Sequence, residues 1–151
     1  MSSARSPGRT GAIYKRPDGF VVHPLNRATT GLGIASEPVW RLPAASSASD
    51  LGAAVLSALA AWRDGVPHPT VWKGYGKAFL KAAGVRSWRS LEAGAAHCIF
   101  SDDGLVLSFL PCKAGETSGF VPSGRPSEVI SCEAPPDVVG AAALRALVIA
   151  P

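Results

Sequence analysis

Two segments of the sequence match each other, and their spacing limits the folds that the chain can adopt. Residues 52–59 (GAAVLSAL) and 140–147 (GAAALRAL) are identical at six of eight positions. An Asp-Gly pair lies between two apolar runs upstream of each segment, at 18–19 and at 103–104. The corresponding offsets are 88 and 85 residues. This regularity predicts an internal duplication. The alternative is coincidence between two ordinary ββα units, because alanine-rich helices match by chance more easily than most.

Each half of the repeat has the pattern of a hairpin followed by a helix. Proline presets φ, aspartate binds nearby backbone N–H groups and glycine accepts positive φ, so Pro-Asp-Gly at 17–19 favours a tight turn. Apolar residues recur every three or four positions from Leu51 to Trp62, which favours an amphipathic helix. The predicted elements are hairpin strands at 13–16 and 20–23, short strands at 31–34 and 38–43, a helix at 51–64 capped by Ser49 or Asp50, hairpin strands at 97–100 and 105–110, short strands at 120–121 and 129–132, and a helix at 138–149 capped by Asp137.

These patterns predict an α+β fold. Local hairpins make an antiparallel sheet, and a helix from each half packs on it. We expect one domain over residues 12–151, in which two related hairpin/strand–helix halves (12–65 and 96–151) are joined by a helical insert (66–95). Residues 1–11 are rich in Ser, Gly, Pro and Arg and are predicted to be a disordered tail. The run 105–110 is largely apolar on both alternating faces, which predicts an internal strand.

The insert carries the chain's excess of positive charge. Residues 70–92 contain five of the 15 Lys and Arg residues and one acidic residue, so their net charge equals the +4 of the whole chain. Periodicity predicts a helix over 71–83 with an aromatic face and a lysine face, followed by a short helix capped by Ser87. The lysine face is either a solvated surface or a contact for an acidic partner or nucleic acid. The aromatic face comprises Trp72, Tyr75, Phe79 and Ala82, and the lysine face comprises Lys73, Lys77 and Lys81.

Two tryptophans of the insert allow two interpretations. Trp72 and Trp88 either pack the insert onto the sheet, which we expect, or anchor a protein interface. The loops 25–34 and 112–125 are further candidates for an interface, because polar, glycine-rich loops on a rigid scaffold commonly carry binding residues.

The sequence predicts no catalytic, metal or cofactor site. The three cysteines have no C-x-x-C spacing, and no histidine lies three or four residues from any of them, so we expect free thiols. Asp102 and Asp103 are interpreted as a hairpin turn, and the three histidines as surface or hydrogen-bonded residues. The longest apolar run, 51–62, is shorter than the about 20 residues that span a bilayer. The N-terminus lacks the apolar region of a secretory signal. We therefore expect a cytoplasmic protein with no membrane partner.

Several stretches resemble a known family. IYKRPDGFVVHPL at 13–25, SEPVWRL at 36–42 and GVPHPTVWKGYGKAFLKAAGVRSWRSL at 65–91 are similar to the CdiI immunity proteins of bacterial contact-dependent growth inhibition, in particular to the DUF1436-type group. The most specific part is V-P-x-P-T-x-W, followed by a lysine helix and G-V-x-S-W, at 66–88. The resemblance runs from about 13 to 147.

The resemblance implies a binding protein that is not an enzyme. CdiI proteins bind the C-terminal toxin domain of a CdiA effector, commonly a nuclease, and neutralise it inside the producing cell. It implies a one-to-one complex in the cytoplasm and no cofactor. Family residue roles do not transfer, because contact surfaces diverge with the toxin. On general grounds, the candidate toxin-binding residues are Arg27, Lys73, Lys77, Lys113, Glu116 and Arg125.

The net charge bears on the choice between functions. An inhibitor of a basic nuclease is usually acidic, so a chain at +4 indicates either an acidic patch on the toxin or a contact away from the lysine helix. The alternative function is a small nucleic-acid-associated or regulatory binding domain that uses the basic central helix. Direct nucleic-acid binding is not expected, because the sequence has no such motif and its strands carry few aromatic residues. A hydrolase with an unrecognised site is the least favoured class.

Overall fold

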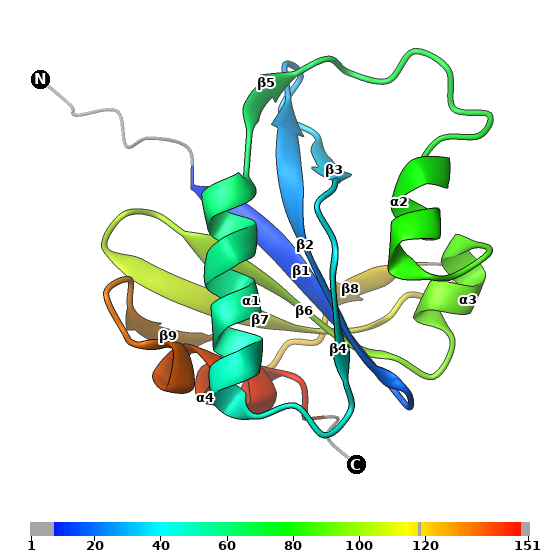
Figure 1. The fold of residues 1–151 in the computed structure, drawn as a ribbon. Helices are drawn as coiled ribbons and strands as arrows, with labels where there is room; N and C mark the ends of the chain where they lie inside the picture. Colours follow the sequence, from blue (N-terminus) through cyan, green and yellow to red (C-terminus); the bar gives the residue numbers. More distant parts are fainter. Residues whose placement is uncertain (1–7, 118, 149–151) are drawn as a thin grey trace, which may run out of the picture.

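One largely antiparallel sheet organises the protein (Figure 1). The structure is a computed structural model and describes residues 8–117 and 119–148. In chain order, the elements are β1 (Arg9–Arg16), β2 (Gly19–Ala28), β3 (Gly33–Ala35), β4 (Trp40–Pro43), α1 (Ala48–Ala61), β5 (Asp64–Val66), α2 (Lys77–Ala83), α3 (Trp88–Glu92), β6 (Ala96–Asp102), β7 (Val106–Ala114), β8 (Phe120–Pro122), β9 (Glu128–Ser131) and α4 (Pro136–Ala146). The predicted α+β class is confirmed. The short β5, which pairs in parallel with β2, was not predicted.

Two aspartate-glycine turns close the two hairpins. Gly19 has a φ of 149°, and a Cβ there would lie 2.1 Å from the carbonyl oxygen of Leu42, so only glycine fits. At the second turn, Asp103 Oδ1 accepts hydrogen bonds from the N–H groups of Leu105 and Val106, each at 2.9 Å. Asp102 accepts one from Gly104 at 2.7 Å. The interpretation of these two carboxylates as turn residues is confirmed.

The two halves repeat one pairing scheme. In the first half, β2 pairs with β1 and also with two short strands, β3 along its C-terminal part and β4 along its N-terminal part. In the second half, β7 pairs in the same way with β6, β8 and β9. The halves join where β1 pairs with β6, with Ile13 opposite Cys98. The predicted internal position of β7 is therefore confirmed.

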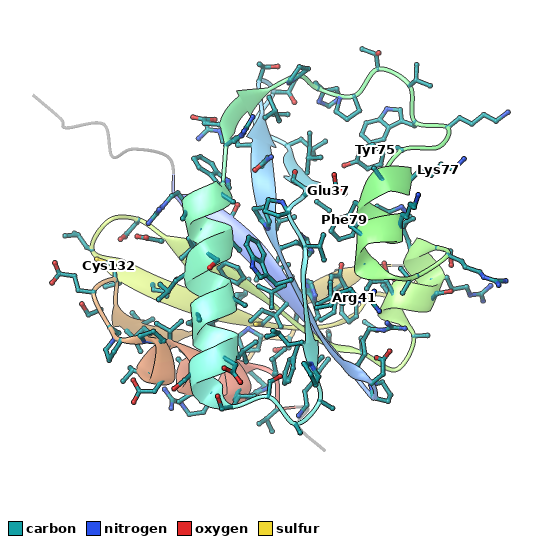
Figure 2. All side chains as sticks on the ribbon, in the orientation of Figure 1. Glu37, Arg41, Tyr75, Lys77, Phe79 and Cys132 are labelled. Carbon is teal, nitrogen blue, oxygen red and sulfur yellow. The ribbon has the colours of Figure 1, made fainter. Side chains whose placement is uncertain are left out.

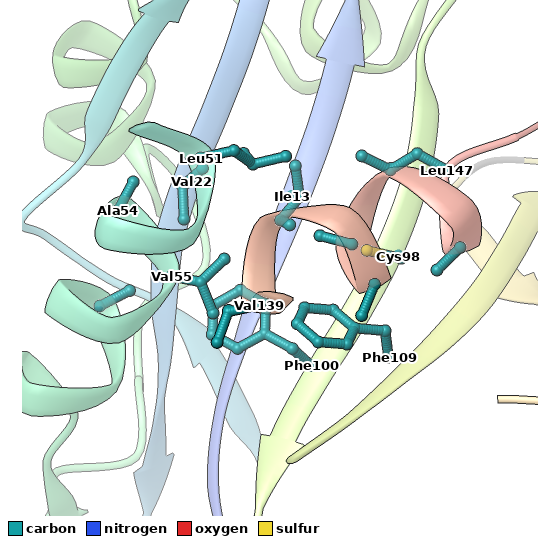
Figure 3. Packing of buried hydrophobic residues seen from close by; sticks show 14 of the residues in the cluster. Ile13, Val22, Leu51, Ala54, Val55, Cys98, Phe100, Phe109, Val139 and Leu147 are labelled. Atoms are coloured by element: carbon teal, nitrogen blue, oxygen red, sulfur yellow. The ribbon is translucent and has the colours of Figure 1, made fainter. Parts of the chain in front are cut away.

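Helices α1 and α4 lie side by side on one face of the sheet (Figure 1). A Cβ at Gly52 would lie 1.8 Å from the carbonyl oxygen of Pro136, and one at Gly140 would lie 1.7 Å from that of Ala48. The matched glycines thus let the two helix backbones touch. Beneath them lies a core of fully buried side chains (Figure 3), which includes Ile13, Val22, Leu51, Val55, Cys98, Phe100, Phe109 and Val139.

Both long helices begin earlier than predicted. The N-cap of α1 is Ser47, whose side chain accepts from the Asp50 N–H at 3.1 Å, while the Asp50 carboxylate accepts from the Ser47 N–H at 3.3 Å. This reciprocal capping box places Asp50 in the first turn instead of at the cap. In α4, Asp137 also lies in the first turn and is not the predicted cap, because Pro136 starts the helix without an N–H that needs a partner.

The insert covers the opposite face near β1 and β2. Phe79, Leu80 and Leu91 from α2 and α3 pack against Tyr14 and Val21 of the sheet. The predicted helix over 71–83 is wrong in its first half, since α2 begins only at Lys77. The cause is a pair of glycines, Gly74 and Gly76, with φ of 76° and 80°, which break the right-handed helix.

The remaining predictions concern the ends of the chain and the cysteines. Arg9–Gly11, assigned to a disordered tail, belong to β1, and Arg9 forms an ion pair with Asp102. Residues 1–7 of that tail lie outside the described residues. Cys98, Cys112 and Cys132 are free thiols. Within 8–117 and 119–148, no helix combines the length and the apolarity needed to cross a bilayer.

Candidate functional site

The segment 67–76, here called the Trp72 loop, connects β5 to α2 and presents apolar side chains to solvent. Val71 is 71% exposed and Trp72 is 54% exposed. The ring of Trp72 meets Tyr75 edge-on at 4.9 Å and His68 at 5.7 Å between ring centres. Two backbone hydrogen bonds close turns within the loop, from Tyr75 N–H to Trp72 O at 3.0 Å and from Lys77 N–H to Gly74 O at 3.2 Å. The loop therefore has a defined shape although it lies outside the regular elements.

Trp88, at the start of α3, has a different environment from Trp72. Its ring stacks on Phe79 with 5.3 Å between ring centres and an interplanar angle of 15°. A Cβ at Gly76 would lie 2.4 Å from the Trp88 ring, so the glycine makes room for it. The expectation that both tryptophans pack the insert onto the sheet is right for Trp88, which packs against the insert-side core, and wrong for Trp72. Helical periodicity alone does not separate the two.

The insert that carries Trp72 has an excess of exposed positive charge. Five cationic residues of the insert are exposed, and within the described part of the chain none of them forms an ion pair. They are Lys73, Lys77, Lys81, Arg86 and Arg89. In Figure 2, Lys77 and Phe79 mark the outer and inner sides of α2. The single acidic residue of the insert, Glu92, is half-buried and accepts a hydrogen bond from the Gly119 N–H at 2.9 Å.

The lysine row predicted on one helix face does not exist as such. Lys73 lies in the Trp72 loop, and only Lys77 and Lys81 belong to α2. The cations are spread over the Trp72 loop, two short helices and the connection between these helices, so they do not form a linear stripe. We call the Trp72 loop, the exposed faces of α2 and α3 and the connection between them (84–87) the basic lobe.

The six predicted contact residues fall into two groups. Lys73 and Lys77 lie on the basic lobe. Arg27, near the end of β2, is 3.6 Å from Asp64 of β5, and the adjoining turn is tied to the Trp72 loop by a 2.7 Å hydrogen bond between Thr30 Oγ1 and His68 Nδ1. The other three are elsewhere, around the strands β7 and β8: Lys113, Glu116 and Arg125.

A cavity of about 390 Å³ lies beside the second group. Lys113 and Arg125 line it, together with Phe120 and Leu147. The Arg125 guanidinium donates to the carbonyl oxygens of Val148 and Arg145, at the C-terminal end of α4. A cation at the negative end of a helix is a stabilising arrangement. Arg125 therefore has a structural role there, and no single-signed surface forms because Glu116 is in the same region.

Two buried histidines lie under the insert, beside Tyr14. The Tyr14 ring centre is 5.9 Å from that of His23 and 4.4 Å from that of His97. Burial lowers the pKa of each histidine to about 4, so both are neutral at neutral pH. Burial also raises the pKa of Tyr14 well above its usual value. His23 Nε2 and His97 Nδ1 have no hydrogen-bond partner among the described residues. The expectation of hydrogen-bonded histidines is confirmed for His23 Nδ1, which lies 2.9 Å from the Pro24 carbonyl oxygen, and is wrong for His23 Nε2 and His97 Nδ1.

The described residues contain no cluster of side chains that could bind a metal ion or act as a nucleophile with a neighbouring base. Within residues 8–117 and 119–148, no cluster of three His, Cys, Asp or Glu side chains could hold a metal ion. Cys98 is fully buried, and burial raises the pKa of its thiol. The basic lobe, by contrast, combines exposed apolar area with unpaired charge, which is the composition of a binding surface.

The fold is shared with solved structures at low sequence identity. No family model matches the chain, and no curated protein matches its sequence. A protein of unknown function from Neisseria meningitidis aligns with a TM-score of 0.76 at 15% identity, over 97% of this chain and 98% of that one. A chain of the CdiA-CT/CdiI toxin and immunity complex from Yersinia pseudotuberculosis aligns with a TM-score of 0.69 at 14% identity, over 94% and 96% of the two chains. Both likenesses establish a common fold along nearly the whole of each chain.

Proposed function

We propose that this chain is an immunity protein that binds and neutralises the C-terminal toxin domain of a CdiA-type effector. The observation that carries the proposal is the fold, which a chain of a CdiA-CT/CdiI toxin and immunity complex shares over 94% of this chain. The resemblance of 66–88 to CdiI sequences supports the same function from independent information. The proposal places the protein in the cytoplasm of the producing cell, in a one-to-one complex with a toxin that is a nuclease.

An inhibitor of this kind acts by occupying a surface, so it needs anchors and charge in place of reacting groups. The exposed Val71 and Trp72 supply apolar anchors, and the exposed cations of the insert supply long-range attraction. The buried neutral histidines under the insert are packing residues in this function.

Co-expression tests the proposal. The toxin domain encoded next to this chain is induced in a test bacterium with and without it, and each protein is also induced alone. We expect the toxin alone to stop growth, this chain alone to leave growth unchanged, and the pair to grow. The purified proteins should elute as a one-to-one complex by size-exclusion chromatography with light scattering. Growth arrest despite co-expression, with no complex at micromolar concentrations, would contradict the function.

The alternative function is a nucleic-acid-associated domain. Its motivating feature was the lysine row on one helix, which the structure does not contain. Titration of mixed-sequence RNA and DNA at two salt concentrations checks it, because phosphate binding weakens steeply as salt rises. At both salt concentrations, we expect the chain to bind RNA and DNA more weakly than it binds the toxin domain.

A further inference from the structure

The basic lobe combines three properties: exposed apolar side chains, exposed cations without ion-pair partners in the described chain, and a loop that is closed by backbone turns. Leu32, which is 41% exposed, lies in a turn that is bonded to the base of the Trp72 loop. The bonds are the 2.7 Å contact of Thr30 with His68 and the 3.0 Å contact of the Thr29 N–H with Val66 O.

The fixed backbone matters for affinity. Tyr75 and His68 hold the Trp72 ring edge-on, and the loop's own turns hold its backbone. A side chain that is ordered before binding loses less conformational entropy when a partner covers it. Trp72 is therefore a preformed anchor of the type that dominates protein interfaces.

The charge specifies the partner's sign. The insert that carries this anchor has five exposed cations without ion-pair partners in the described chain, while its one carboxylate, that of Glu92, accepts a hydrogen bond from the Gly119 N–H. Such a surface attracts an acidic region and repels a basic one. A basic toxin surface would meet like charge across the whole lobe.

The exposed apolar side chain of Val71 favours a protein partner over a nucleic-acid partner. Phosphate contacts gain nothing from covering a valine that is 71% exposed, whereas a protein pocket removes that area from water. The region of Lys113, Glu116 and Arg125 offers no comparable combination, because its charges are mixed and Arg125 is engaged by α4.

We infer that the basic lobe is the toxin-binding surface, and that its partner is an acidic protein surface with an apolar pocket that receives Trp72. This inference rests on the proposed function and adds the face, the anchor and the partner's chemistry. An acidic cleft on the toxin fits this description.

The test measures binding of the purified toxin domain by calorimetry and biolayer interferometry. Trp72→Ala should weaken binding by about 30-fold or more, the range of an anchor residue. Its matched control is Val129→Ala on β9. This change truncates an apolar side chain that is 57% exposed and lies outside the lobe, so the variant should bind like the wild type. Both changes are at exposed positions, and circular dichroism with thermal unfolding verifies the fold of each variant.

A second pair of variants tests the charge. Lys73→Glu with Lys77→Glu should slow association by about tenfold at low salt and remove most of its salt dependence. The matched control is Lys113→Glu with Lys15→Glu, two exposed lysines outside the lobe, which should change association by less than about threefold.

The possible outcomes test the proposed binding surface and the proposed immunity function separately. Loss of binding in both lobe variants, with intact controls, supports the inference. Wild-type binding and full protection by both lobe variants would overturn the surface and leave the immunity function standing. Absence of any complex with the unaltered chain would overturn the function itself. Tight, salt-sensitive RNA or DNA binding that Lys73→Glu with Lys77→Glu abolishes would overturn the acidic protein partner.

Discussion

The two faces of the sheet are covered in different ways. On one face, α1 and α4 touch through small residues, and Gly52 and Gly140 bring backbone against backbone. On the other, two short helices of the insert pack a few aromatic side chains over β1 and β2 and leave Trp72 outside. The contact between α1 and α4 has no space for a larger side chain at Gly52 or Gly140, whereas the insert exposes Trp72 to solvent. The contrast indicates that one face provides stability and the other provides contact.

The largest expected effect comes from closing the helix contact. Gly52→Leu places a side chain where the Pro136 carbonyl oxygen lies, 1.8 Å from the first added atom, and backbone cannot move aside as a side chain can. We expect a loss of about 4 kcal/mol or more in the free energy of unfolding, measured by urea denaturation. Ala53→Leu, at an exposed position of the same helix, should change it by less than about 0.5 kcal/mol. Equal effects at both positions would remove the distinction between the faces.

A smaller loss is expected when the insert's own anchor is removed. Phe79→Ala empties a buried site between α2 and the sheet and should cost about 3 kcal/mol. Lys77→Ala in the same helix is the control and should be nearly neutral. Hydrogen exchange should show faster opening in 77–92 and unchanged protection in α1 and α4. Uniform loss of protection would show that the two faces do not open separately.

Acid should act on the insert face, because both buried histidines lie there. Their pKa values are lowered to about 4, so the neutral form is favoured in the fold. This contribution is complete above pH 6.5, the usual histidine pKa, and is lost as the pH falls toward 4, at about 1.4 kcal/mol per pH unit for each histidine.

The measurement is unfolding by urea at about pH 7 and about pH 5. His97→Leu should make the loss between these conditions smaller by about 2 kcal/mol, because one of the two groups no longer titrates. An unchanged pH dependence in this variant would show that other groups control acid sensitivity.

The smallest effect on stability is expected at Trp72. Its ring is half exposed, so Trp72→Ala should change the free energy of unfolding by less than about 0.5 kcal/mol. Trp88→Ala, which removes the stack on Phe79, should cost about 2 kcal/mol. Thermal unfolding of the two variants compares a tryptophan that is exposed with one that is stacked on Phe79. A destabilised Trp72→Ala protein would assign that ring to packing.

Much of the scaffold is predictable because local signals act there. The aspartates at 102 and 103 bind the backbone of their own turn, so the sequence specifies the second hairpin directly. The matched Gly52 and Gly140 also carried a signal. Glycine inside a helix costs about 1 kcal/mol relative to alanine, so its presence at equivalent positions of two alanine-rich helices indicates a close backbone approach.

The candidate site is less predictable because it depends on conformations that periodicity does not report. Spacing alone extended the insert helix back to residue 71, whereas Gly74 and Gly76 adopt positive φ and free Lys73 and Trp72 from it. Likewise, Arg125 looks like a free loop cation in the sequence, and only the position of the α4 end shows that its guanidinium is engaged.

The pairing of β1 with β6 has a consequence for how the chain could have arisen. Each half alone would expose the edge of its first strand and the glycine side of its helix, both of which the other half covers. Exposed strand edges recruit further strands, so an isolated first half should pair with a second copy of itself. We propose that the protein corresponds to a dimer of related units joined by the insert, which differs from both halves and so makes one end of the scaffold distinct from the other.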